Sequence, residues 1–175
     1  MNKPAVMISI RPEWCQKISL GQKTIEIRKS KPRLKPPFKC YIYCTSNRNG
    51  TLDLLETHGT DGRIRKANQK VIGEFVCREI TNIEVMDNGI IRNYNYSHIY
   101  DSCVPYDDIV NYIGNGMTGY GWRISDLCIY DQPRSISEFF VESNATHDCP
   151  SLVPMKRPPQ SWCHVYGGNT HADAT

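Results

Sequence analysis

The sequence has no long run of apolar residues. No stretch among its 175 residues approaches the ~20 consecutive apolar residues of a membrane-spanning helix. The opening segment, MNKPAVMISI, holds only a short apolar run that Pro4 interrupts, and this pattern indicates a first strand rather than a secretory signal. We therefore expect a cytoplasmic protein with no membrane partner.

The cysteines lack the paired C-x-x-C spacing that makes a zinc motif specific. Without a secretory signal, the eight cysteines are expected to be reduced thiols, and Cys77 and Cys128 are expected to be small buried hydrophobes within strands. Two looser groups have the right ligand types for zinc: Cys40 with Cys44, and His147, Cys149, Cys163 and His164. Neither spacing predicts a site, so we assign no metal and no cofactor.

A strong net charge is also missing. The formal charge is +3, and the 39% hydrophobic and 22% charged contents are those of an ordinary soluble domain. The five histidines are scattered and form no catalytic cluster. The net charge therefore does not indicate a class of partner, and the interpretation depends on where charged residues cluster along the chain.

Acidic residues are absent from one such cluster, RKSKPRLKPPFK at residues 28–39. Its cations are Arg28, Lys29, Lys31, Arg33, Lys35 and Lys39. Its three prolines exclude a helix and favour an extended arm. Such an arm is what the phosphates of a nucleic acid would meet first, although a solvated loop would have the same composition.

The arm follows a short segment, GQKTIEIR at residues 21–28, that has a strand-like alternation. In an extended strand Glu26 and Arg28 share one face with Thr24, while Ile25 and Ile27 point to the other. A strand fixes the positions of its charged groups, which suits a site for a small polar ligand. The alternative is a solvated strand face with a weak Glu–Arg pair.

Hydrophobic and turn patterns predict strands that alternate with short helices. Strands are predicted over residues 5–10, 24–29, 39–45, 70–83, 120–130 and 158–165, and helices over residues 12–20, 105–113 and 135–140. No internal repeat and no second domain is evident. The economical fold is α+β, a small curved sheet or barrel with helices over its ends.

These residues resemble the ASCH family of the PUA-like β-barrel superfamily. The resemblance rests on ISIRP at residues 8–12, on the order G-x-K-x-x-E-x-R at residues 21–28, on VIGEF at residues 71–75 and on YGWRI at residues 120–124. It implies a PUA-like barrel of about five to six strands. One domain over residues 1–166 is expected, with insertions near 46–69, 85–104 and 140–157 and a frayed tail at 167–175.

The resemblance implies a pocket for RNA or a modified nucleobase on one side of the barrel. Lys23 and Arg28 would donate to phosphate or base oxygens, Glu26 would accept from a base N–H, and the arm cations Lys29, Lys31 and Arg33 would extend the surface. An unpaired base would stack on an aromatic ring, for which the candidates are Trp14, Tyr120 and Trp122. Each ring is equally explained as core, and Trp122 is the best candidate because it follows a glycine.

Catalysis is the alternative to binding. Similar small bacterial proteins deacetylate N4-acetylcytidine with a lysine and a threonine nucleophile, and Lys23 matches the lysine while Glu26 holds the threonine's place. Some ASCH proteins cleave RNA, for which Lys23 and Glu26 would form a metal-independent acid–base pair. We favour binding of RNA or a nucleoside without chemistry, and keep both hydrolases as alternatives.

Overall fold

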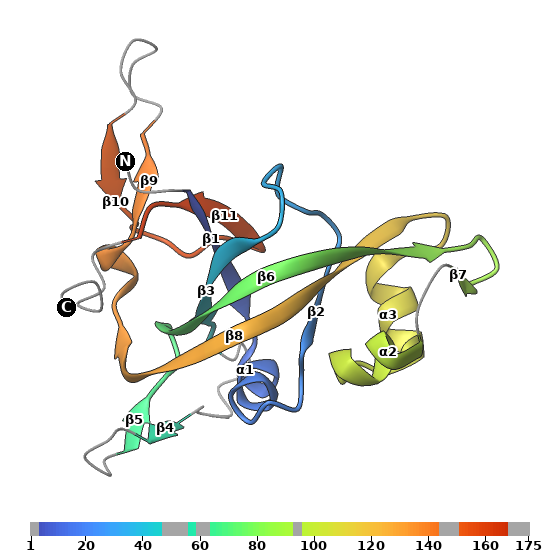
Figure 1. The fold of residues 1–175 in the computed structure, drawn as a ribbon, viewed down its shortest axis with the longest axis horizontal. Helices are drawn as coiled ribbons and strands as arrows, with labels where there is room; N and C mark the ends of the chain where they lie inside the picture. Colours follow the sequence, from blue (N-terminus) through green and yellow to red (C-terminus); the bar gives the residue numbers. More distant parts are fainter. Residues whose placement is uncertain (1–3, 47–55, 59–63, 93–95, 144–150, 168–175) are drawn as a thin grey trace. The chain divides into compact units, whose positions relative to one another are not determined.

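The structure is a computed structural model that describes residues 4–46, 56–58, 64–92, 96–143 and 151–167 (Figure 1). Parts of the three expected insertions, the tail beyond Gly167, and the zinc candidates His147 and Cys149 lie outside the described residues. Among the described residues, no helix is long and apolar enough to cross a membrane.

Strands dominate the chain, and two of them are unusually long. The elements in chain order are β1 (Ala5–Ile10), α1 (Pro12–Ser19), β2 (Ile25–Arg28), β3 (Phe38–Cys44), β4 (Glu56–His58), β5 (Ile64–Lys66), β6 (Lys70–Val85), β7 (Ile91–Arg92), α2 (Tyr96–Ser102), α3 (Tyr106–Ile113), β8 (Thr118–Arg134), the 3₁₀ helix η1 (Ile136–Glu138), β9 (Phe140–Glu142), β10 (Leu152–Pro154) and β11 (Trp162–Val165). This mixture confirms the α+β class.

One mixed sheet contains most of these strands. Its order is β11-β1-β3-β6-β8-β2, with β7 paired to β6, while β4–β5 and β9–β10 form separate two-stranded sheets. Among the described residues the order ends at β11 and at β2 without closing, so the predicted closed barrel is not confirmed. The chain forms two compact units, and β6 and β8 each contribute residues to both.

The first unit is built around β1. This strand is buried along its whole length, so both of its faces are covered, and it runs parallel to β3 and antiparallel to β11. Its core joins Met7 to Tyr41, Phe139 and Val165. Gly73 in β6 is required here, because a Cβ atom would overlap the backbone carbonyl of Cys128 on β8.

The second unit contains β2, the helices α2 and α3, and the adjoining parts of β6 and β8. Its core packs Ile25 and Ile27 of β2 and Ile83 of β6 against Ile109 and Ile113 of α3. Gly114 ends α3 with a positive φ of 99°, a conformation that glycine adopts without strain.

Most predicted elements are present, and the differences concern short elements. The predicted helix at 135–140 is only the short η1, which a Ser135–Glu138 capping box begins. The small hairpins β4–β5 and β9–β10 were not predicted. Cys77 is buried as predicted, but the prediction for Cys128 is wrong because its side chain is exposed.

Candidate functional site

The candidate site begins on β2, where the predicted alternation is present. Ile25 and Ile27 are buried in the core, and Glu26 and Arg28 project from the opposite face. β2 pairs antiparallel with β8 so that Glu26 lies opposite Trp122 and Arg28 opposite Tyr120. Residues directly opposite each other share a face, so these four side chains form one surface of the sheet.

That surface is not the solvated strand face of the alternative interpretation. Glu26 is 5% exposed and accepts two cations, one on each carboxylate oxygen. Lys23 Nζ lies 3.3 Å from Oε2, and Arg28 Nη2 lies 3.1 Å from Oε1. We call these three residues the Lys23–Glu26–Arg28 cluster, and with two cations and one carboxylate it carries a formal charge of +1.

Lys23 is the most deeply buried member of the cluster. It precedes β2, and its backbone N–H donates to the carbonyl of Lys17 in α1. Its ammonium donates to the backbone carbonyl of Ser102 at 2.6 Å and lies 5.2 Å from the ring centroid of Trp14. The neighbouring N–H of Thr24 donates to the carbonyl of Asp101, so the chain at the end of α2 is fastened to the start of β2.

Access to the cluster is graded. The exposed side-chain fractions are 1% for Lys23, 7% for Glu26 and 12% for Arg28. Arg28 is therefore the most accessible member of the cluster. Among the described residues Glu26 Oε2 accepts no hydrogen bond, so this buried oxygen has only the ion-pair contact with Lys23.

The basic arm leaves this cluster at Arg28. Lys29, Lys31, Arg33 and Lys35 are exposed, whereas Pro32 is buried. Two of the lysines lie over tyrosine rings: Lys29 Nζ is 5.2 Å from the centroid of Tyr112, and Lys31 Nζ is 4.9 Å from that of Tyr120. These cation–π contacts hold the beginning of the arm against α3, through Tyr112, and against β8 of the sheet, through Tyr120.

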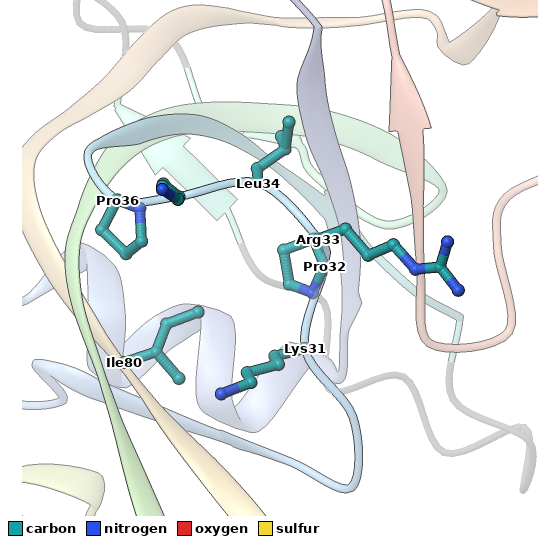
Figure 2. A pocket seen from close by; sticks show the side chains of 7 residues that line it. Lys31, Pro32, Arg33, Leu34, Pro36 and Ile80 are labelled. Atoms are coloured by element: carbon teal, nitrogen blue, oxygen red, sulfur yellow. The ribbon is translucent and has the colours of Figure 1, made fainter.

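The arm also encloses a hollow of about 450 Å³. Its lining residues are Lys31, Pro32, Arg33, Leu34, Lys35, Pro36 and Ile80. In Figure 2 the Lys31 side chain extends toward Ile80 of β6, whereas Arg33 points away from both. The hollow therefore combines an apolar lining with cations and contains no acidic residue.

Comparison with known proteins gives matches among solved structures; no family model and no curated protein matches. A crystal structure of ASCH from Zymomonas mobilis is 17% identical with a TM-score of 0.52, over 91% of this chain and 85% of that one. Its serine-to-alanine variant is 17% identical with a TM-score of 0.58, over 91% and 86%. Its tyrosine-to-phenylalanine variant is 16% identical with a TM-score of 0.52, over 91% and 88%.

This chain has an ASCH-like fold. The predicted resemblance is thus confirmed for the fold, and at this level of identity the likeness carries no activity. Within the ASCH-like fold, the signature residues Lys23, Glu26 and Arg28 lie together as ion pairs. Trp14 is half-buried beside Lys23, and Tyr120 is half-buried beside Lys31.

Trp122 is placed differently from the prediction. It is fully buried, and its ring meets Phe38 edge to face at 5.9 Å between centroids. In this ASCH-like sheet Trp122 lies on the same face as Glu26 but is a core residue, and its ring offers no surface for stacking. Its glycine neighbour Gly121 instead makes room for Ile25 and Thr81, on the opposite side of the sheet.

Three contributors to the site were not predicted. Ser102 offers a backbone carbonyl, Ile80 lines the hollow, and Tyr112 supports Lys29. Every residue has a backbone carbonyl, so the sequence does not indicate which carbonyl contacts Lys23. Lys23 and Ser102 are 79 positions apart, and only the three-dimensional fold brings them together. Among the described residues no group of three or more His, Cys, Asp or Glu side chains is arranged to hold a metal ion.

Proposed function

We propose that this protein binds single-stranded RNA, or a modified nucleobase within it, at the Lys23–Glu26–Arg28 cluster and the basic arm. The observation that supports this most is the direct continuity of the two: an exposed arm without acidic residues begins at the most accessible member of a buried, oriented ion cluster.

The arm supplies affinity for phosphates. Four exposed cations lie within seven residues, at Lys29, Lys31, Arg33 and Lys35. The arm contains no acidic residue that could pair with them in place of a phosphate. Neutralising phosphates releases counterions, which makes affinity depend steeply on salt. An exposed cluster of this kind is the electrostatic footprint expected of a nucleic-acid site.

The cluster supplies the means to recognise a base. The Glu26 carboxylate can accept an amino or imino N–H of a base, while Arg28 donates to a base or phosphate oxygen. Burial fixes these groups in position and strengthens their hydrogen bonds. The half-buried ring of Tyr120, opposite Arg28 in the register, provides the aromatic face on which an unpaired base stacks.

The test is fluorescence anisotropy with a labelled single-stranded RNA over a range of salt concentrations. Lys31→Ala/Arg33→Ala/Lys35→Ala removes three arm charges and should reduce the slope of log affinity against log salt by about two. Lys66→Ala/Lys156→Ala/Arg157→Ala is the matched control, because it removes three exposed cations from the other unit. Arg28→Ala should weaken binding without abolishing the salt dependence.

The same experiment contains its refutation. An equal loss in both triple variants would show attraction by net charge alone, and a wild-type protein that retains no RNA would sink the proposal. The hydrolase alternatives are tested by incubating the protein with the RNA and with a panel of free modified nucleosides and analysing both by mass. Either activity would give a product that the Lys23→Ala and Glu26→Ala variants do not form.

A further inference from the structure

We infer that the hollow enclosed by the basic arm is a second nucleotide site, which holds a neighbouring nucleotide of the same RNA strand and does not distinguish between bases. This inference rests on the proposed function and deepens it. The occupant is a nucleotide rather than a nucleoside, because the hollow offers both an apolar surface and cations.

The hollow has the dimensions and the surface for a base. Its volume of about 450 Å³ falls in the range of small-molecule sites. Four of its seven lining residues are apolar: Pro32, Leu34, Pro36 and Ile80. Figure 2 shows Pro32, Pro36 and Ile80 placed around it, and rigid side chains of this kind can pack against the flat face of a base at little entropic cost.

The remaining lining residues define the charge of the occupant. They are Lys31, Arg33 and Lys35; the Lys31 side chain extends toward Ile80 while that of Arg33 points away, so cations and no carboxylate flank the apolar surface (Figure 2). Charge complementarity therefore selects an anionic ligand with an apolar face. A nucleotide has this combination, since its phosphate is anionic and its base has a π-face that stacks independently of sequence.

The hollow lies on the same face of the sheet as the cluster. Thr81 Oγ1 contacts the carbonyl of Gly121, and Ile83 is in the core with Ile25. Side chains alternate along a strand, so Ile80 projects from the opposite face, which Glu26 and Arg28 also use. The cluster and the hollow thus share one side of this unit.

Lys31 connects the two places. It lines the hollow, and its Nζ lies over the ring of Tyr120, which stands opposite Arg28. Arg28 and Lys31 are three residues apart, so their backbones are separated by about 10 Å at most. One short RNA strand can therefore contact Arg28 with one nucleotide and the hollow with another.

The side chains of the hollow indicate what it does not recognise. Prolines, Leu34 and Ile80 have no side-chain donor or acceptor for a base edge, and the cations are the groups that suit phosphate. Discrimination would then come from Glu26 and Arg28, while the hollow adds affinity for any flanking nucleotide. This division predicts that chain length, rather than sequence, governs binding at the hollow.

The test compares a labelled uridine monophosphate with oligouridylate and oligocytidylate probes of about eight nucleotides. Ile80→Glu places a carboxylate in the hollow and should reduce affinity for both oligonucleotides by roughly 10-fold or more while leaving the mononucleotide unchanged. Ile80→Gln, without the charge, should lose less. Val153→Glu is the matched control, because Val153 is a partly exposed strand residue of the other unit.

Lys35→Glu provides an independent variant at an exposed position, where folding is not at stake, and Lys66→Glu is its control. It should weaken oligonucleotide binding and lower its salt dependence, whereas Lys66→Glu should do neither. Circular dichroism verifies that each variant is folded.

Three outcomes would overturn the inference. Wild-type affinity of Ile80→Glu and Lys35→Glu for the oligonucleotides, with loss in Arg28→Ala, would leave the proposed function standing and remove the second site. An equal loss for the mononucleotide would place the effect at the cluster. Retention on vesicles of anionic lipid without any RNA binding would refute both proposals in favour of a membrane surface.

Discussion

Replacing Glu26 by Gln should destabilise the fold more than replacing Lys23 by Met, although lysine is the more buried of the two. Glu26 is the carboxylate that Lys23 and Arg28 share, so Glu26→Gln removes this counter-charge from both cations on a buried surface. Removing one partner of a buried ion pair typically costs about 3–5 kcal/mol. For a chain of this size that lowers the melting temperature by roughly 6–20 °C.

Lys23→Met has a smaller expected cost for a structural reason. Methionine keeps most of the buried stem, and Glu26 retains its 3.1 Å ion pair with Arg28. What is lost is the 3.3 Å ion pair with Glu26, which keeps its other cation, and the charge-assisted hydrogen bond from the ammonium to the Ser102 carbonyl. Such a loss costs about 1–3 kcal/mol.

The double variant Lys23→Met/Glu26→Gln completes a thermodynamic cycle. We expect its cost to fall short of the sum of the single costs by about 1 kcal/mol or more, because without Lys23 the Glu26→Gln change leaves one cation, Arg28, rather than two without a counter-charge. Urea denaturation followed by circular dichroism gives the three free energies of unfolding. Arg78→Met/Asp126→Asn, at an exposed ion pair, is the control and should show nearly additive small costs.

Additivity at Lys23 and Glu26 would refute this reasoning. It would mean that the two groups do not interact in the folded protein and that the cluster is hydrated. A Glu26→Gln variant whose free energy of unfolding is nearly unchanged would lead to the same conclusion. It would support the alternative interpretation of β2 as a solvated strand face.

Two further predictions concern parts of the fold outside the cluster. Gly73→Ala should destabilise the protein by about 1–3 kcal/mol in thermal denaturation, because the added Cβ meets the backbone carbonyl of Cys128; an unchanged transition would show that the strands can separate there. Burial raises the pKa of the Cys77 thiol to about 11. Between the ordinary thiol pKa and that value the folded protein keeps a proton that the unfolded chain releases, so the free energy of unfolding should fall as the pH rises through this window. Urea midpoints at neutral and alkaline pH should show a smaller decline in Cys77→Ala, and an equal decline in Cys77→Ala and in the exposed Cys128→Ala would contradict this assignment.

Local pattern was sufficient to predict β2 and its two faces. Ile25 and Ile27 alternate with Glu26 and Arg28, and this period of two is a property of the backbone itself. Burial of the charged face was not predictable in the same way. The burial of Lys23 depends on Trp14 of α1 and on the backbone carbonyl of Ser102. Ser102 lies 79 positions from Lys23 in the sequence.

Trp122 and Cys128 show the same limit from the other direction. The sequence places both in one apolar strand, and the period of two assigns them to the same face. β8 is long, and the elements that cover it change along its length: Phe38 packs on Trp122, while Cys128 is exposed. Which part of a strand is covered is decided by its neighbours, and the strand's own composition does not record them.

The hydrogen bond between Lys23 and the Ser102 carbonyl gives the segment that precedes α3 a structural role at the candidate site. The family resemblance predicts that residues 85–104 are an insertion into a smaller domain. In the structure, the end of that material closes over the signature lysine. A trimmed domain that omits this segment would keep every residue of the signature and lose the carbonyl to which the Lys23 ammonium donates, so the environment of Lys23 depends on residues outside the signature.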